Sequence, residues 1–462
     1  MKARKDLTQG AILPHILRMS LPILIGMMAQ MMLNIIDGIY VGRLGIESSV
    51  AVLNYGFPVF YLLFAFFNGL SIGTNSVLAR FIGAKKIDEA EQSLSQILWI
   101  CLGIFGVAVL LYPLAMPAYL TFLKASETTA ALTHQFLTFL FLGMPFTLIS
   151  LSLGGGLRAE GNMRALASAQ MAAVLLNIVL GPFFIFSTFH VFGMDWHGLG
   201  WGVKGAGLAS TTANILATLM IMRFYLGKKT QLRWVLWPSW KSLEGVKGIF
   251  TVGVPSSVSQ ILIGLNWILM TRLAAHFGET AVAAIGIGGR LDLLSVFPAL
   301  AVMTSILTLV GQNFGARKHD RVAETVRTGL LTAFVGLTVL SLIVFALRHA
   351  LIGLFHQDSG TEGSALHYLT FQCLGYGLIG INIACSGAFQ GLGRGLPFLL
   401  LTSMRLLALA LPAAYLLSRH LGEYGLHYAP VIANLVTAFI ATFWILSTVR
   451  KLSAAPVAAG AA

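Results

Sequence analysis

The sequence predicts an all-α polytopic membrane protein made of two homologous halves, each with six transmembrane helices. Only 10% of the 462 residues are charged, 57% are hydrophobic, and the mean hydropathy is +0.82. A soluble chain carries about 25% charged residues because its surface faces water. The apolar residues form twelve long runs, and the last six repeat motifs of the first six. No polar interdomain linker, expected in a soluble chain of this length, is evident.

Each transmembrane helix needs about 20 mainly apolar residues to cross the hydrocarbon core. The first run follows a basic N-terminus, but it is too long for a signal-peptide core and lacks a small-residue cleavage site. We therefore expect it to be retained as a helix. The expected spans are residues 16–41, 50–79, 94–112, 132–153, 165–186, 206–225, 249–275, 281–309, 328–347, 368–389, 397–417 and 428–449.

The basic residues are distributed unevenly between the loops. With a cytoplasmic N-terminus, about 23 of the 30 Lys and Arg residues lie inside and about six lie outside. Cytoplasmic loops carry such an excess. The pattern predicts a multi-pass protein of the cell (inner) membrane with both termini in the cytoplasm. The charges stand in short clusters between apolar runs, so the net charge of +13 indicates the lipid bilayer as partner and no nucleic acid.

The second half of the chain repeats the first at an offset near 232 residues. SLPILIGMMAQ corresponds to GVPSSVSQILI, and FIGAKKIDEAEQ to NFGARKHDRVAE, which pairs Gly83 with Gly315. Two even-numbered halves insert in the same orientation, and such parallel repeats build transporters with a site near the bilayer midplane. We expect an N-terminal lobe at 1–232, a cytoplasmic linker at 233–245 and a C-terminal lobe at 246–462.

Several motifs, in order and duplicated, resemble the multidrug and toxic compound extrusion (MATE) family. They are LNIIDGIYVGRLG, RFIGAKK, GLRAEGN, LNIVLGP, VKGAGLAS and VGQNFGARK. The resemblance covers the whole chain. It implies a V-shaped pair of six-helix lobes that exports small cationic, amphipathic drugs in exchange for protons or sodium ions. Because the duplication already supplies both lobes, we expect a monomer to be functional.

Asp37 is the first candidate for ion coupling. A carboxylate within a transmembrane span is costly unless it is paired, hydrated or protonated. Asn34 and Asp37 match the N-x-x-D-x-x-x-V-G pattern of the family's cation-site helix, so the resemblance implies that Asp37 is the coupling acid. The alternative is an acid that faces water near the outer end of its span.

Asn177 and Ser210 are candidate partners of this acid in the fifth and sixth spans. The family pattern there reads N-x-x-x-D-P, whereas this chain reads NIVLGP, with Gly181 in place of the second carboxylate. This loss favours protons over sodium. The alternative is that both residues are interhelical hydrogen-bonding groups. Pro22, about four turns before Asp37, is a candidate hinge or a static kink.

Arg290 and Asp292 lie inside the eighth span, two residues apart, so they do not face each other. We expect a structural ion pair with another helix, in preference to a cation site at Asp292. The sodium-coupled branch of the family uses acids in the seventh and tenth spans, and none stands at 249–275 or 368–389 here. Candidate residues of a central substrate cleft are Gln30, Tyr55, Asn68, Asn75, Asn266, Arg290 and Asp292.

No catalytic, nucleotide-binding or metal-binding motif is recognisable, so we expect a transporter without cofactor or metal, driven by an ion gradient. The alternative function is a flippase for lipid-linked saccharides. Such a flippase needs a more cationic central cavity to hold pyrophosphate. The few basic residues expected inside the membrane, essentially Arg290, argue against this alternative.

Overall fold

The computed structural model describes residues 6–42, 47–122, 126–191, 193–227, 229–355 and 358–454. In these ranges twelve helices are long and apolar enough to cross a membrane, as predicted. The eleventh span is composite, because a π-helical segment, η2, joins α11 to α12. The helices are α1 (Ile12–Gly42), α2 (Glu47–Gly83), α3 (Ile87–Phe122), α4 (Glu127–Ala159), α5 (Met163–Ile185), α6 (Gly202–Leu226), α7 (Glu244–Ala274), η1 (Ala275–Phe277), α8 (Glu279–Gly315), α9 (His319–Gly353), α10 (Ser359–Gly391), α11 (Gly395–Ser403), η2 (Met404–Ala410), α12 (Leu411–Leu421) and α13 (Tyr424–Ala454).

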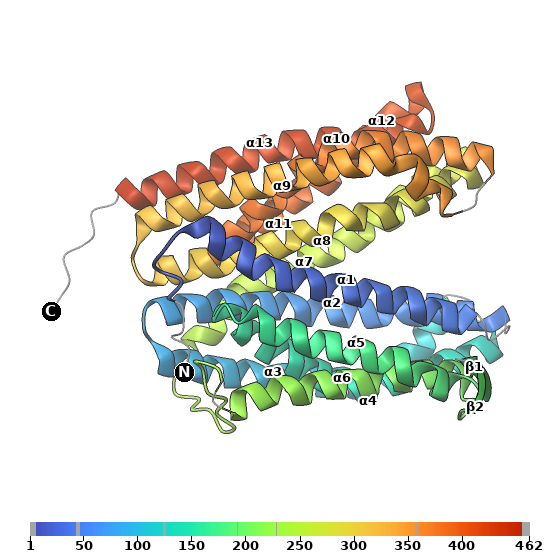
Figure 1. Ribbon diagram of the computed structural model, residues 1–462, viewed down its shortest axis with the longest axis horizontal. Helices are drawn as coiled ribbons and strands as arrows, with labels where there is room; N and C mark the ends of the chain where they lie inside the picture. The colour runs from blue at the N-terminus through green and yellow to red at the C-terminus, as the bar shows by residue number, and fades with distance from the viewer. Residues whose placement is uncertain are drawn as a thin grey trace.

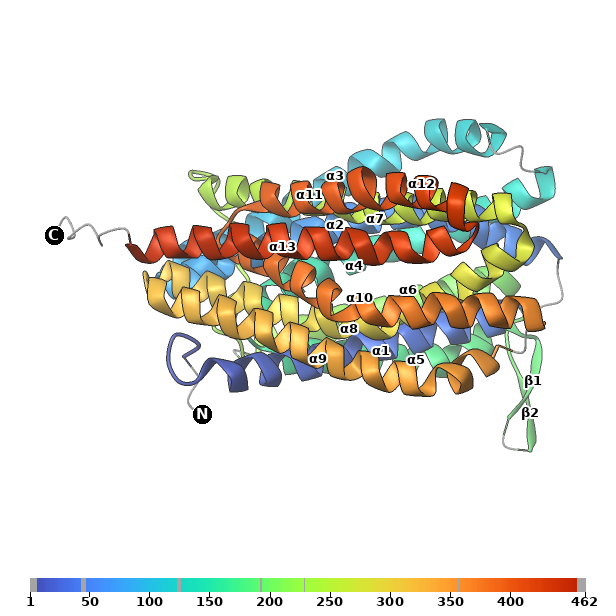
Figure 2. The same cartoon turned by 90° about the horizontal axis from the view of Figure 1, so that it is seen from above.

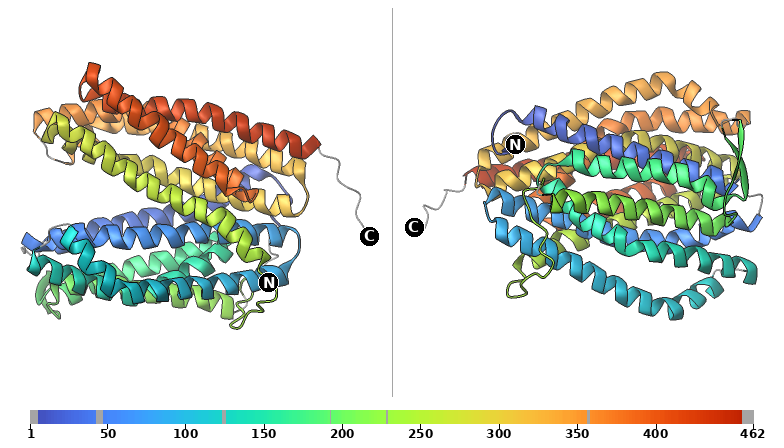
Figure 3. Two further views of the ribbon diagram at one scale, coloured as in Figure 1. Left: turned by 180° about the vertical axis from the view of Figure 1, so that it is seen from behind. Right: turned by 60° about the horizontal axis from the view of Figure 1, so that its bottom comes forward.

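Helices α1–α6 form one lobe and α7–α13 the other (Figure 1). The lobes lie close together near the chain termini and diverge toward the opposite end, and the view from behind agrees (Figure 3). We call these the closed end and the open end. Each lobe has its own core, and repeat-related positions occupy both: Leu94 and Leu157 in the first, Val326 and Phe389 in the second. The predicted two-lobed V is confirmed.

The closed end is sealed by close backbone contact between the lobes. A Cβ added at Gly83 would lie 2.0 Å from the carbonyl oxygen of Gln312, and one at Gly315 would lie 2.0 Å from that of Arg80. Only glycine permits such an approach. The Gln312 side chain also donates from Nε2 to the Ala159 carbonyl at 2.7 Å. The two glycines paired by the sequence repeat therefore form one symmetric seam.

A β-hairpin at the open end was not anticipated from the sequence. Strands β1 (Thr188–Val191) and β2 (Met194–His197) pair antiparallel between α5 and α6. Figure 2 shows the hairpin projecting from the helical bundle. The Phe183 ring packs edge-on against the hairpin residues Phe189 and Trp196. These ring contacts attach the hairpin to the end of α5.

The segment between α6 and α7 is held along α3. The Gln96 side chain donates from Nε2 to the carbonyls of Ser239 and Ser242 at 2.5 and 2.9 Å. Trp99 donates to the Leu236 carbonyl at 2.8 Å and stacks on Trp237. The polar stretch expected to be a linker is thus fixed to the N-terminal lobe over much of its length.

Candidate functional site: a central cavity between the lobes

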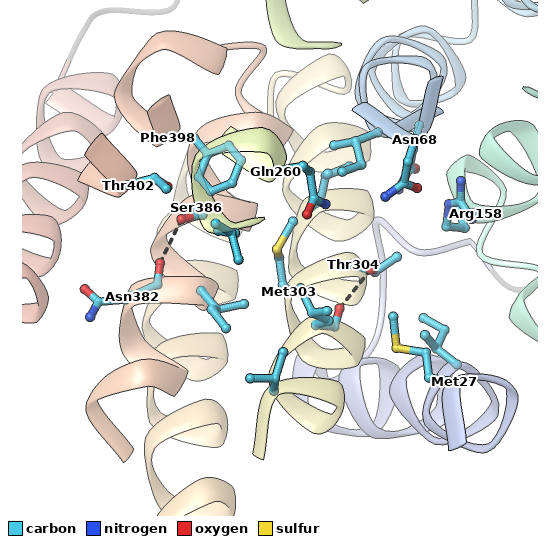
Figure 4. A pocket seen from close by; sticks show the side chains of 18 of the residues that line it. Met27, Asn68, Arg158, Gln260, Met303, Thr304, Asn382, Ser386, Phe398 and Thr402 are labelled. Atoms are coloured by element: carbon cyan, nitrogen blue, oxygen red, sulfur yellow. Dashed lines mark hydrogen bonds between the residues drawn. The ribbon is translucent and has the colours of Figure 1, made fainter. Parts of the chain in front are cut away.

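A cavity of about 350 Å³ lies between the two lobes, from the middle of the helices toward the closed end, where the end of α4 and the start of α5 line it. This volume is within the range of small-molecule sites. Its wall is mainly aliphatic, with amides, hydroxyls and two arginines. In Figure 4, Phe398, Thr402 and Asn382 of the C-terminal lobe lie on one side, and Asn68 and Arg158 of the N-terminal lobe on the other. The arrangement suits an amphipathic ligand.

The predicted cleft residues are distributed over several places. Asn68 and Asn75 line the central cavity. Asn75 also joins the lobes, because its Oδ1 accepts from the Thr308 hydroxyl at 3.2 Å. Asn266 and Asp292 line a separate cavity of about 170 Å³ inside the C-terminal lobe.

Three predicted cleft residues lie away from both cavities. Gln30 and Arg290 are exposed. Tyr55 lies on the side of α2 that faces α3, where its carbonyl accepts from the Tyr119 hydroxyl at 2.9 Å. Sequence reasoning could assign these residues to spans, but the side of each helix depends on packing.

The predicted coupling region lies inside the N-terminal lobe, where α1 packs along α5. Leu33 packs against Val174, and the Tyr40 hydroxyl donates to the Ile178 carbonyl at 3.2 Å. Asp37 and Asn34 belong to this stretch of α1, but their side chains are outside the described part of the structure. The backbone of α1 at position 37 therefore runs beside the middle of α5.

Asn177, at the middle of α5, is fully buried. Its Nδ2 donates to the Ser210 Oγ on α6 at 3.3 Å. The structure thus brings together the two polar residues selected from the sequence. A Cβ at Gly181, where the family pattern has an acid, would lie 3.0 Å from the Tyr40 ring. A side chain at position 181 would therefore meet the aromatic ring of Tyr40.

Pro22 lies inside α1, and the helix continues through it. Proline lacks the N–H needed for an intrahelical hydrogen bond, so this position is a weak point of the helix. The Ser20 hydroxyl, two residues earlier, lies 2.9 Å from the Ser305 hydroxyl of the other lobe. The helix is consequently held at the closed end just before its proline.

The expectation that Asp292 forms an ion pair with another helix is wrong, because Asp292 forms no ion pair among the described residues. Asp292 accepts hydrogen bonds from two tyrosines of α10, Tyr368 to Oδ2 at 2.7 Å and Tyr376 to Oδ1 at 2.9 Å. The ion pairs found in the described ranges are Lys86–Glu89 and His190–Asp195. The two tyrosines are eight residues apart, about two helical turns, so they share one face of α10. Both carboxylate oxygens are therefore satisfied by neutral donors.

The count of basic residues within the spans is also corrected. Arg158, near the end of α4, and Arg405, in η2, both line the central cavity. Neither arginine was among the basic residues expected inside the membrane. The position of Arg405 within the expected span 397–417 was the signal that could have identified it. Among the described residues that line this cavity there is no Asp or Glu.

The described ranges contain no group of three or more His, Cys, Asp or Glu side chains arranged to hold a metal ion. The three cysteines are buried and unpaired. The lining of the central cavity offers hydrogen-bonding groups, positive charge and apolar surface to a ligand.

Two homologous six-helix lobes around a shared amphipathic cavity define a multi-pass membrane transporter. The chain belongs to the MATE family, since the MatE family model matches residues 22–183 and again 255–416. This match covers both halves of the repeat. The two matched segments are separated by the end of the N-terminal lobe and the α6–α7 connection.

Similar proteins agree with this assignment. The chain is 25% identical to the multidrug export protein MepA of Staphylococcus saprophyticus and 26% identical to that of Staphylococcus aureus, over 94% of this chain and 93% of each relative. It is similar to an outward-facing multidrug resistance MATE transporter of the MOP superfamily, with a TM-score of 0.91 and 26% identity over 98% of this chain and 100% of the other. A Vibrio cholerae MATE transporter, VcmN, shares the fold with a TM-score of 0.85, over 95% of this chain and 97% of that one, at 23% identity.

Proposed function

We propose that this protein is a secondary active antiporter that exports amphipathic small molecules in exchange for protons. The observation that supports the proposal is the packing of α1 on α5: Leu33 packs against Val174 and the Tyr40 hydroxyl donates to the Ile178 carbonyl, in the stretch of α5 that carries Asn177. In this proposal Asp37 takes up the proton, and Asn177, Ser210 and Asn34 are its coupling partners. Cargo binds separately, in the central cavity.

Protons are favoured over sodium as the coupling ion. A sodium ion requires several oxygen ligands and is best held with firm negative charge, as hard cations are. The Tyr40 ring occupies the space beside Gly181, where the family pattern supplies a second carboxylate. A single carboxylate with an amide and a hydroxyl can hold one proton.

Alternating access follows from the two-lobed form. The closed end seals the cavity where the chain termini lie, and the basic loops at that end favour a cytoplasmic location. Proton uptake at Asp37 in the outward-open state weakens the hold on cargo. Rearrangement of α1 about Pro22 then exposes the cavity to the cytoplasm, where the proton leaves.

The experiment uses purified protein in proteoliposomes loaded with the cationic dye rhodamine 6G or, in parallel, with the anionic dye fluorescein. Efflux is measured under an imposed pH gradient and, separately, under a sodium gradient of equal size. The pH gradient alone should drive efflux above the rate in protein-free liposomes. Equal or faster efflux under the sodium gradient alone would overturn proton coupling. Efflux of neither dye under either gradient would overturn antiport.

A flippase for lipid-linked saccharides stays as a second candidate because of one observation. Arg158 and Arg405 give the cavity the cationic lining that such a function needs. The cavity volume of about 350 Å³, however, suits a drug-sized molecule better than a lipid-linked saccharide. Expression in an exporter-deficient strain separates the two: drug tolerance indicates the exporter, and rescue of a flippase-deficient strain indicates the flippase.

A further inference from the structure

Arg405 occupies an unusual position in the eleventh span. It lies in η2, and π-helical segments inside α-helices are frequent at functional sites. Its side chain lines both the central cavity and the smaller cavity of the C-terminal lobe. A cationic side chain within a membrane span is costly and is expected to have a partner or a functional role.

The partners found for Arg405 do not neutralise it. Its Nη1 donates to the Asn434 Oδ1 at 3.3 Å, and a guanidinium has five N–H donors in all. Asp292 lines the same smaller cavity, but it forms no ion pair among the described residues and both its oxygens accept from tyrosines. The charge of Arg405 thus remains available to a ligand in either cavity.

The net charge of the central cavity also favours an anionic ligand. Its described lining contains Arg158 and Arg405 and no acidic side chain. Arg158 is already engaged in part, because its Nη2 donates to the Ser71 hydroxyl at 2.5 Å. In a low-dielectric site, uncompensated positive charge attracts an anion and repels a cation strongly.

We propose that the central cavity binds the anionic group of an amphipathic organic molecule, with Arg405 as its anchor. The apolar body of the ligand packs on the aliphatic wall and on Phe398. A guanidinium can bind a carboxylate, sulfonate or phosphate through two parallel hydrogen bonds. Asn434 holds the guanidinium toward the cavities. This inference rests on the proposed export function and defines the charge of the cargo.

The test compares two dyes with the same xanthene scaffold and opposite charge, fluorescein (anionic) and rhodamine 6G (cationic). Binding to the purified full-length protein is measured by fluorescence anisotropy. Wild type should bind fluorescein more tightly. Arg405→Gln should weaken fluorescein binding by about tenfold to a hundredfold, as expected for loss of a charge-assisted contact, and should not weaken rhodamine binding. Arg405→Lys, which keeps the charge, should retain part of the affinity.

Arg419→Gln is the matched control, because Arg419 is exposed on α12 and bonds to Tyr415 within its own helix. It should bind both dyes as wild type does. The inference is overturned if wild type prefers rhodamine 6G, or if Arg405→Gln weakens both dyes equally while its thermal stability stays at the wild-type value. If Arg405→Gln is unstable, Arg405→Lys decides, and equal loss for both dyes then contradicts the anion site.

A competition experiment, in which unlabelled amphiphiles displace bound fluorescein, distinguishes a phosphate ligand from a carboxylate ligand. Stronger displacement of fluorescein by dodecyl phosphate than by dodecanoate would indicate a phosphate-headed lipid as cargo, and the reverse a carboxylate-bearing small molecule. Displacement by neither would contradict the site. Efflux of both dyes from proteoliposomes, measured in parallel, separates the two proposals. Gradient-driven efflux without fluorescein binding would contradict only the proposed anion site. Fluorescein binding without efflux of either dye would contradict only the proposed export function.

Discussion

At the scale of single residues, the structure changes the interpretation of the charged groups most. Asp292 could be identified from the sequence, since an acid inside an apolar run is conspicuous. Its partners could not, because Tyr368 and Tyr376 meet it only through the register of α10 against α8. The same holds for Asn177 and Ser210, which were candidates from the sequence but whose side chains lie 3.3 Å apart only because α5 packs on α6.

Tyr376→Phe tests the hydrogen bonding of Asp292. Removing this hydroxyl leaves Oδ1 without its donor, so we expect a loss of about 1–3 kcal/mol in the free energy of unfolding. Thermal unfolding in detergent measures it. In the double variant with Asp292→Asn the two losses should not add, because both changes disrupt one network. Tyr415→Phe on exposed α12 is the control, and an equal loss there would contradict the assignment.

At the scale of elements, the hydrophobic runs predicted the transmembrane spans, because a helix must be long and apolar to cross the hydrocarbon core. Two features were missed. The hairpin Thr188–His197 is short and exposed, so no apolar period marks it. The π-helical turn of η2 depends on tertiary packing and has no sequence signature of its own. Helix ends, by contrast, carry local signals, of which Asp358 before α10 is an example.

Asp358 should stabilise α10 in a pH-dependent way. Hydrogen bonds from the Thr361 hydroxyl and backbone and from the Gly360 N–H hold the pKa of Asp358 below its usual value of 3.8. A lowered pKa in the folded state means that the carboxylate stabilises the fold above pH 3.8, and that this contribution is lost as the pH falls through the lowered value. Asp358→Ala should therefore lower the melting temperature at pH 7, and the difference from wild type should shrink below pH 4.

Thermal melts from pH 7 to pH 3 check this cap. Asp358→Asn is the matched control, because its amide oxygen can still accept at the start of the helix. It should stay close to wild type at pH 7. A constant difference between wild type and Asp358→Ala over the whole pH range would show that the carboxylate charge has no part in the cap.

At the scale of the whole molecule, the sequence repeat predicted the two lobes and paired Gly83 with Gly315. The repeat alone could not show that each glycine contacts the opposite lobe, because it relates equivalent positions and not contacting ones. The structure places each against a backbone carbonyl across the seam. The closed end is therefore a junction that must separate if the transporter is to open on the other side.

Gly83→Ala and Gly315→Ala should each weaken the closed end. The added Cβ meets a backbone oxygen that cannot move independently, so we expect a cost of about 1–3 kcal/mol. Hydrogen–deuterium exchange should rise at residues 80–86 and 312–318. Gly106→Ala on α3 is the control, since a Cβ there meets nothing within 4 Å. Unchanged exchange in both seam variants would contradict the role of the seam.

The central claim is that one acid in the N-terminal lobe, Asp37, couples export to the proton gradient. The most direct measurement compares wild type with Asp37→Asn in proteoliposomes, following efflux of the dye that wild type exports, fluorescein or rhodamine 6G, with and without an imposed pH gradient. Asparagine keeps the size of the side chain but cannot take up a proton. We expect the variant to bind the dye and to lose the acceleration by the gradient. If Asp37→Asn still couples dye efflux to the pH gradient, the claim is wrong.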